Sequence, residues 1–169
     1  GLRLLVARLP EVIIATSCSK NLGLYRERTG ATIFVCRDPA NARAVISQAQ
    51  VAARRIYSMP PAHGALLAGR ILMNDHLGGI WRAELEVMCQ RINSLRSILR
   101  EALEVRCDRD YSFIEREKGM FSFLGLSAVQ SHRLRQYYCF YMLDSSRINV
   151  AGVNTRNIDY LAESVSKVL

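Results

Sequence analysis

The segment that decides the fold of this chain runs Val12-Ile-Ile-Ala-Thr-Ser-Cys-Ser-Lys20-Asn-Leu-Gly-Leu-Tyr-Arg-Glu-Arg28. Its first part, about residues 11–16, is an apolar run that predicts a buried strand. Lys20 comes just after this run, where the chain must leave the strand. An amine held at the end of a buried strand is a candidate nucleophile toward an aldehyde.

Groups that suit a phosphate surround this lysine. Ser17 and Ser19 offer hydroxyls, and Arg28 offers a planar fork of donors that matches phosphate oxygens. A lysine that forms a Schiff base next to a phosphate site suggests pyridoxal 5'-phosphate as the cofactor.

The composition limits the class of protein. The chain has 169 residues, a net charge of +8 and 50% hydrophobic residues, which allows one core or parts of two and argues against disorder. No apolar stretch approaches the roughly 20 residues of a transmembrane helix. The positive charge would suit nucleic acid, but the arginines are scattered and are not interleaved with aromatic residues. We therefore expect a basic enzyme that handles anions, with no nucleic-acid or membrane partner.

The cysteines and histidines carry no metal or disulfide pattern. The five cysteines form no Cys-x-x-Cys pair and their number is odd, which favours free thiols in a reducing cytoplasm. His63, His76 and His132 lack zinc-ligand spacing, so we expect no metal site. The start, Gly1-Leu-Arg, has neither a methionine nor a signal-peptide layout, so we expect a piece of a longer protein.

The middle of the chain predicts one more strand and three helices. The strand covers residues 31–36, and Asp38 caps a helix that begins at Pro39 and runs to about Arg54. Two prolines make residues 57–61 non-helical, and a further helix covers about 62–74. A long amphipathic helix follows, over about 77–105. It can join two domains, 1–88 and 89–169; a coiled-coil seam is the weaker alternative, since the pattern lasts only about three heptads.

The rest of the chain predicts a small α+β unit. Short strands are expected at 119–123, 141–143 and 148–150, and a capping box begins a helix at Ser127. A closing helix carries five apolar residues on one face: Ile158, Leu161, Ala162, Val165 and Val168. The fold class is therefore mixed α/β.

Four separated segments resemble one known family. They are residues 17–28, 57–64 (Tyr-Ser-Met-Pro-Pro-Ala-His-Gly), 119–123 (Gly-Met-Phe-Ser-Phe) and 146–152 (Ser-Arg-Ile-Asn-Val-Ala-Gly). Together they resemble the class I pyridoxal-phosphate-dependent aminotransferases, in the aspartate and aromatic-amino-acid branch. The resemblance implies the C-terminal portion of the aspartate aminotransferase-like fold. Residues 1–88 would be the end of the large cofactor domain, and 89–169 the small C-terminal domain.

The resemblance also implies roles for individual residues. Lys20 would form the Schiff base with the cofactor and carry the proton between substrate and cofactor, and Ser17, Ser19 and Arg28 would bind the phosphate. Arg147 would hold the substrate α-carboxylate. The alternatives are a surface lysine, a turn hydroxyl at Ser19 and a surface arginine.

The remaining implications concern the substrate. Arg54 would reach the partner subunit's active site and meet the distal carboxylate of a dicarboxylic substrate, although adjacent Arg55 leaves the register open. Phe121 would line the substrate pocket, with core packing as the alternative. The reaction would be a ping-pong transfer of an amino group from aspartate or an aromatic amino acid to a 2-oxo acid such as 2-oxoglutarate, in a cytoplasmic homodimer.

Two residues depart from the family pattern, and a large part of the family's usual sequence is not in this chain. Met59 stands where Asn is common, and Ser146 stands where Gly is common, so a Cβ there could crowd a special backbone conformation. The family's N-terminal half, with its glycine-rich phosphate loop and the Asp that keeps the pyridine protonated, is not in the chain. We therefore expect the chain alone to neither bind the cofactor tightly nor transaminate. A lyase or decarboxylase of the same fold and a non-catalytic interaction fragment remain as alternatives.

Overall fold

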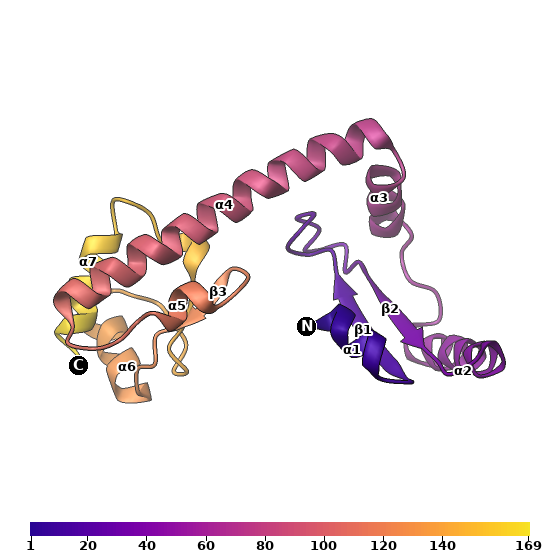
Figure 1. The fold of residues 1–169 in the computed structure, drawn as a ribbon, viewed down its shortest axis with the longest axis horizontal. Helices are drawn as coiled ribbons and strands as arrows, with labels where there is room; N and C mark the ends of the chain where they lie inside the picture. Colours follow the sequence, from indigo (N-terminus) through magenta and orange to yellow (C-terminus); the bar gives the residue numbers. More distant parts are fainter. The chain divides into compact units, whose positions relative to one another are not determined.

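The computed structural model describes all of residues 1–169, and the chain divides into two compact units, Gly1–Ala83 and Glu84–Leu169. Helix α4 (Asp75–Arg106) contains the division, as the sequence predicts for its long amphipathic stretch (Figure 1). The boundary expected after residue 88 lies in the same helix. None of the helices is both long enough and apolar enough to cross a membrane.

The first unit is built around a two-stranded antiparallel sheet. Helix α1 (Leu2–Arg8) leads into β1 (Val12–Ser17), which pairs with β2 (Gly30–Val35) from Val12 opposite Val35 to Ser17 opposite Gly30. Both strands are present as predicted, but the burial expected for residues 11–16 is wrong within this chain, since no residue of β1 is buried. Helix α1 was not expected. Its N-cap residue, Gly1, gives no side-chain hydrogen bond, so the sequence carries no start signal there.

Helix α2 (Pro39–Tyr57) begins as predicted, because the Asp38 side chain accepts a hydrogen bond from the Asn41 N–H at 2.8 Å. It ends later than expected, since Tyr57 is helical and the chain leaves the helix at Ser58, with φ of 61°. The prolines do not prevent this extra turn. A proline has no N–H group to donate to a carbonyl one turn earlier. Here those carbonyls belong to the last turn of α2, and the carbonyls of a last turn have no partner within the helix in any case.

Helix α3 (His63–Leu72) completes the first unit together with the start of α4. The unit has almost no interior, since Gly64, Ala68 and Gly78 are its only buried residues. Large apolar side chains are exposed on each of its helices and on both strands, among them Ile13 at 73% and Ile56 at 77%. The first unit alone therefore does not close a hydrophobic core.

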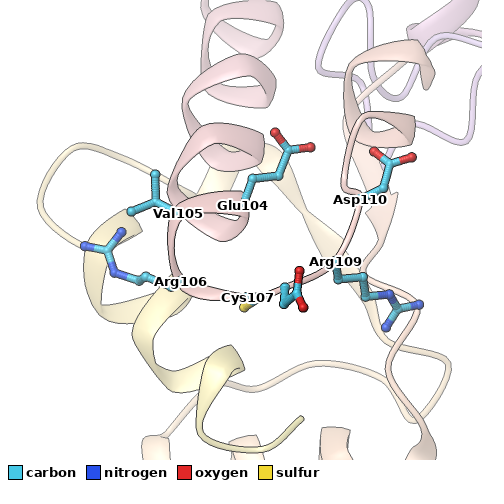
Figure 2. Close-up of a pocket in the computed structure, with 7 residues that line it drawn as sticks. Glu104, Val105, Arg106, Cys107, Arg109 and Asp110 are labelled. Carbon is cyan, nitrogen blue, oxygen red and sulfur yellow. The ribbon is translucent and has the colours of Figure 1, made fainter.

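The second unit folds around the C-terminal part of α4. It adds α5 (Phe113–Arg116), β3 (Phe121–Phe123), α6 (Ala128–Tyr138), β4 (Arg147–Asn149), the short 3₁₀ helix η1 (Val150–Gly152) and α7 (Ile158–Ser166). The capping box at Ser127 is present, and β3 pairs with β4 in antiparallel register. At the end of α4 the chain bends sharply, and residues 104–110 line a shallow hollow (Figure 2).

The strand predictions in this unit are confirmed only in part: β3 begins at Phe121, two residues later than expected, and the strand predicted at 141–143 is absent. Residues 141–143 form a loop, because the Met142 carbonyl accepts a hydrogen bond from Arg135 Nη1 at 2.6 Å and not from a neighbouring strand. Their apolar pattern reflects one buried side chain, Met142. Val150 belongs to η1, so β4 ends one residue earlier than expected.

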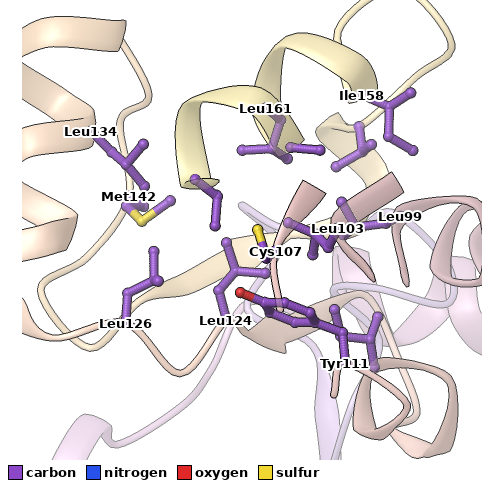
Figure 3. Packing of buried hydrophobic residues seen from close by; sticks show 14 of the residues in the cluster. Leu99, Leu103, Cys107, Tyr111, Leu124, Leu126, Leu134, Met142, Ile158 and Leu161 are labelled. Atoms are coloured by element: carbon purple, nitrogen blue, oxygen red, sulfur yellow. The ribbon is translucent and has the colours of Figure 1, made fainter. Parts of the chain in front are cut away.

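The core of the molecule lies in this second unit. Side chains from α4, α5, α6 and α7 and from the loops between the elements of this unit meet in one cluster, in which Leu99 and Leu103 are fully buried (Figure 3). Tyr111 packs among them, and its burial raises its pKa to about 12, so the phenol stays neutral. The apolar face predicted for the closing helix is confirmed, since Ile158, Leu161, Ala162, Val165 and Val168 are all buried.

Truncating the core should destabilise the second unit measurably. Leu103→Ala removes a fully buried side chain and should lower the free energy of unfolding by about 3 kcal/mol. Val105→Ala, two residues along the same helix at a side chain that is 82% exposed, should change it by about 0.5 kcal/mol or less. Urea unfolding of both variants checks this; equal losses would contradict the core assignment.

Candidate active site

The loop that carries Lys20 is closed at its base by the β1–β2 pair. Ser17 lies opposite Gly30, and the Cys18 N–H donates to the Thr29 carbonyl at 2.9 Å. Glycine is required at position 30, since a Cβ there would overlap the backbone carbonyl of Thr16. The two ends of the loop therefore lie side by side, and the residues just after β1 lie close to those just before β2.

Inside the loop, backbone hydrogen bonds turn the chain around Lys20. The N–H groups of Leu22 and Leu24 both donate to the Cys18 carbonyl, and Gly23 has φ of 67°, which favours glycine. The exposed Lys20 side chain extends over the Tyr25 ring, with Nζ 4.2 Å from the ring centroid. This contact holds the ammonium group near the surface of the loop and orients it.

Three of the residues expected at the phosphate line one groove. Ser17, Ser19 and Arg28 contribute to its wall together with β2 and the apolar side of α2, and its volume is about 750 Å³. The Ser17 hydroxyl donates to the Ser19 hydroxyl at 3.0 Å, and Arg28 Nη1 donates to the Tyr25 carbonyl at 2.8 Å. Two hydroxyls and a guanidinium in one groove form a donor set that suits a phosphate group. Lys20 adjoins this set in the chain but does not line the groove.

Two contacts that anchor this loop were not predicted. Trp81 on α4 donates from Nε1 to the Asn21 carbonyl at 2.7 Å, and His63 Nδ1 lies 2.9 Å from a carboxylate oxygen of Glu27. Each contact joins residues far apart in the sequence, so no local sequence pattern predicts it. The chain's single tryptophan, in a charged amphipathic helix, was the only available hint.

Arg54 lies in the last turn of α2, where its carbonyl accepts a hydrogen bond from the Ser58 N–H. Its neighbours Ile56 and Tyr57 line the groove, but Arg54 does not. The structure therefore does not bring Arg54 to the hydroxyl and guanidinium set. Nearby Met59, one of the two departures from the family pattern, is 86% exposed.

The second unit holds the other two predicted site residues, and it brings them together. The Arg147 guanidinium lies over the Phe121 ring, with Cζ 4.9 Å from the ring centroid. Arg147 begins β4 and is exposed, while Phe121 begins β3 and is 37% exposed. Phe121 is thus available at the surface and is not a core residue.

Ser146, the second departure, adopts the left-handed backbone conformation with φ of 62°. The conformation that favours glycine is therefore needed here, just before Arg147. Two hydrogen bonds hold the serine in this conformation. Its Oγ accepts from the Gly125 N–H at 3.0 Å, and its N–H donates to the Leu143 carbonyl at 2.9 Å. The Cβ is accommodated without loss of the strand that follows.

Comparison with known proteins agrees with this arrangement. The family described as aminotransferase class I and II matches residues 1–165. The chain belongs to this family. Its fold is that of the C-terminal portion of aspartate and aromatic-amino-acid aminotransferases, as the resemblance of its four segments implied.

Individual relatives make the likeness specific. The chain is 44% identical over its whole length to the aspartate aminotransferase of Escherichia coli, of which it covers 43%, and 42% identical over 99% of its length to the aromatic-amino-acid aminotransferase of Pseudomonas aeruginosa, of which it covers 42%. Among solved structures, the aromatic-amino-acid aminotransferase of Burkholderia pseudomallei, covalently bound to pyridoxal phosphate, superimposes with a TM-score of 0.90 at 38% identity, over 99% of this chain and 42% of that one. The chain thus spans less than half the length of these relatives.

The close approach at Gly30 can be tested directly. Gly30→Ala should push β1 and β2 apart, break the Cys18–Thr29 hydrogen bond and cost about 1–3 kcal/mol. Gly69→Ala, in helix α3 where nothing lies within 4 Å of an added Cβ, should instead be neutral or stabilising. Hydrogen exchange at the Cys18 amide is the measurement: faster exchange is expected in the first variant only, and equal protection in both would contradict the close approach.

Proposed function

We propose that this chain is the C-terminal part of a pyridoxal-phosphate-dependent aminotransferase that takes the amino group from aspartate or an aromatic amino acid and passes it to a 2-oxo acid such as 2-oxoglutarate, by a ping-pong mechanism. The observation that carries the proposal is Lys20, on a closed loop next to the groove lined by Ser17, Ser19 and Arg28. The names of the aspartate and aromatic-amino-acid aminotransferases quoted above support the substrate classes.

The residues of the loop suit the proposed cofactor. Ser17, Ser19 and Arg28 would hold its phosphate, since two hydroxyls and a guanidinium supply the hydrogen bonds and the charge that a phosphate needs. The Lys20 amine would hold its aldehyde. When bound, pyridoxal phosphate supplies an electron-withdrawing ring that makes the substrate Cα–H bond acidic. Lys20, once released by the substrate, would take up that proton from the substrate and pass it to the cofactor.

Arg147 would bind the substrate α-carboxylate. Its exposed guanidinium, supported from behind by the Phe121 ring, can present two parallel N–H donors to a carboxylate. Fixing the carboxylate fixes the direction of the Cα–H bond, and orientation is a large part of catalysis. Phe121 would line the substrate pocket. Arg54 would meet the distal carboxylate of a dicarboxylic substrate from the partner subunit, which fits its separation from the groove of its own chain.

The remaining parts of the proposal concern the two domains and the whole protein. We assign the first unit to the end of the large cofactor-binding domain and the second to the small C-terminal domain of a cytoplasmic homodimer. The apolar side chains that the first unit leaves exposed support an assignment in which further protein covers them. The chain by itself would then lack the parts that hold the cofactor ring, so we expect no turnover from it alone.

Lys20→Ala in the complete enzyme that contains this chain should abolish both the covalent attachment of pyridoxal phosphate and amino-group transfer. After borohydride reduction, mass spectrometry of the wild-type enzyme should find the cofactor on the peptide of Lys20. Within these 169 residues the other lysines are Lys118 and Lys167, and Lys167→Ala serves as the matched control, since its ammonium is paired with Glu163. Unchanged attachment in Lys20→Ala would contradict the assignment.

The reaction class needs its own measurement. Incubation with an amino acid and 2-oxoglutarate should yield the matching keto acid and glutamate in equal amounts. Release of CO2 or ammonia in place of glutamate would instead favour the decarboxylase or lyase alternative. Amino-group transfer by the isolated chain would contradict our expectation that it is inactive alone.

A further inference from the structure

The second unit contains a buried cation that none of the proposed chemistry uses. Arg96 lies on the face of α4 that packs into this unit, and only 1% of it is exposed. An arginine is almost never buried in this way unless it is paired, because removing the charge from water is costly. Both Nη atoms of Arg96 have partners, whereas its Nε has none. The partners of Arg96 therefore indicate what it does.

Most of those partners belong to one stretch of backbone that leads into β3. Arg96 Nη1 donates to the Ile114 carbonyl at 2.8 Å, and Nη2 donates to the carbonyls of Gly119 and Phe121 at 2.8 and 2.7 Å. The only acidic partner is Glu117, whose carboxylate lies 3.3 Å from Nη1 and also accepts a hydrogen bond from the Ser122 hydroxyl. One rigid guanidinium thus fixes the path of the chain from Ile114 to Phe121.

These hydrogen bonds of Arg96 matter because β3 is a short strand. The strand has three residues and pairs only with the equally short β4. An isolated two-stranded ribbon is marginally stable at best. Ser122 turns its side chain inward and is fully buried, while Phe121 and Phe123 alternate to the exposed face. Arg96 and Glu117 therefore act on the inner side of the strand, and the aromatic rings stand on the outer side.

The outer side is where Arg147 lies. It is directly opposite Phe123 in the strand register, and its guanidinium rests over the ring of Phe121, the residue whose carbonyl Arg96 holds. A displacement of the Phe121 backbone would move the ring and remove the support for the guanidinium above it. Phe121 thus contacts Arg96 through its carbonyl and Arg147 through its ring.

We propose that Arg96 is a positioning residue: by clamping the carbonyls of Gly119 and Phe121 it holds the Phe121 ring under Arg147, and so sets the direction in which Arg147 presents its donors to a carboxylate. The effect on carboxylate binding rests on the proposed role of Arg147 in substrate binding. The coupling of Arg96 to the stacking of Arg147 on Phe121 does not depend on that role.

The coupling can be measured by NMR in the 169-residue chain. Side-chain protons of Arg147 that lie over the Phe121 ring should be shifted upfield by its ring current, and Phe121→Leu should remove this shift. Arg96→Lys keeps the buried charge but replaces a fork that reaches three carbonyls by a single ammonium. We expect it to lose at least half of the upfield shift, while the signals of Leu99 and Leu103 in the core stay in place.

The matched control is Arg100→Lys. Arg100 lies one turn further along α4 and is half-buried, but its ion pairs go to Glu101, Glu104 and Glu115 and none goes to β3. This variant should keep the full upfield shift at Arg147. Retention of the full shift in Arg96→Lys, or an equal loss in Arg100→Lys, would overturn the proposal. If Arg96→Lys does not fold, the wild-type chain is heated, and an Arg147 shift that survives after the Arg96 guanidinium signals have moved to the positions of a solvent-exposed arginine would overturn it as well.

Succinate, titrated into the same chain, tests the link to substrate binding. Its affinity, followed at the Arg147 Nε–H signal, should fall about tenfold in Arg96→Lys, the effect of one lost charge-assisted hydrogen bond, and should not change in Arg100→Lys. The two possible failures are distinct. If Arg147→Ala binds succinate as the wild type does, the proposed function of Arg147 is wrong, whereas failure of the positioning role appears as an unchanged ring-current shift in Arg96→Lys.

Discussion

The pairing of Ser17 with Gly30 is the constraint on which the rest of the candidate site depends. Because these residues face each other at the end of the β1–β2 sheet, the chain between them must form a closed loop. That loop carries Lys20, and its two ends carry the hydroxyls and the guanidinium that line the groove. The Cys18–Thr29 hydrogen bond and the absence of a Cβ at Gly30 allow the ends to approach closely enough for this. Backbone geometry thereby brings the side chains of the candidate site to one end of the sheet.

The two units reach stability by different means. The second has a continuous apolar cluster of fully buried leucine, isoleucine and valine side chains, of the kind that sustains an independent fold. The first has a strand pair and amphipathic helices but buries almost nothing. A helix such as α2, which has no buried residue, gains little from packing within this chain. The site residues of the first unit therefore stand on a scaffold that is held by backbone hydrogen bonds and a few side-chain contacts more than by an apolar core.

The sequence predicted those parts of the fold that have local signals. Asp38 and Ser127 begin helices where their caps require it, the long amphipathic stretch is one helix, and the apolar run before Lys20 is a strand. Helices α1 and α5 were not predicted because they have only 7 and 4 residues, too few to show an apolar periodicity, and neither has a side-chain cap. Residues 141–143 were misassigned since a single buried methionine between exposed neighbours imitates the alternation of a strand.

The difference between local and long-range signals also explains which residues of the candidate site could be predicted. Ser17, Ser19 and Arg28 could be grouped with Lys20 because they lie on one short segment, and the family pattern pointed to Arg147 and Phe121. The contacts of Trp81, His63 and Arg96 join distant parts of the sequence, so their roles depend on the folded backbone and leave no periodic trace. Arg96 in particular looks like an ordinary charged residue of an amphipathic helix until its burial is known.

The hydrogen bond from Trp81 to Asn21 gives this chain an optical property. Trp81 is its only tryptophan, so indole fluorescence comes from one position, and that position is bonded to the backbone carbonyl next to Lys20. Indole emission is sensitive to the polarity and hydrogen bonding around the ring. The tryptophan fluorescence of this chain therefore reports on the conformation of the lysine loop, and no tryptophan in the apolar core contributes to it.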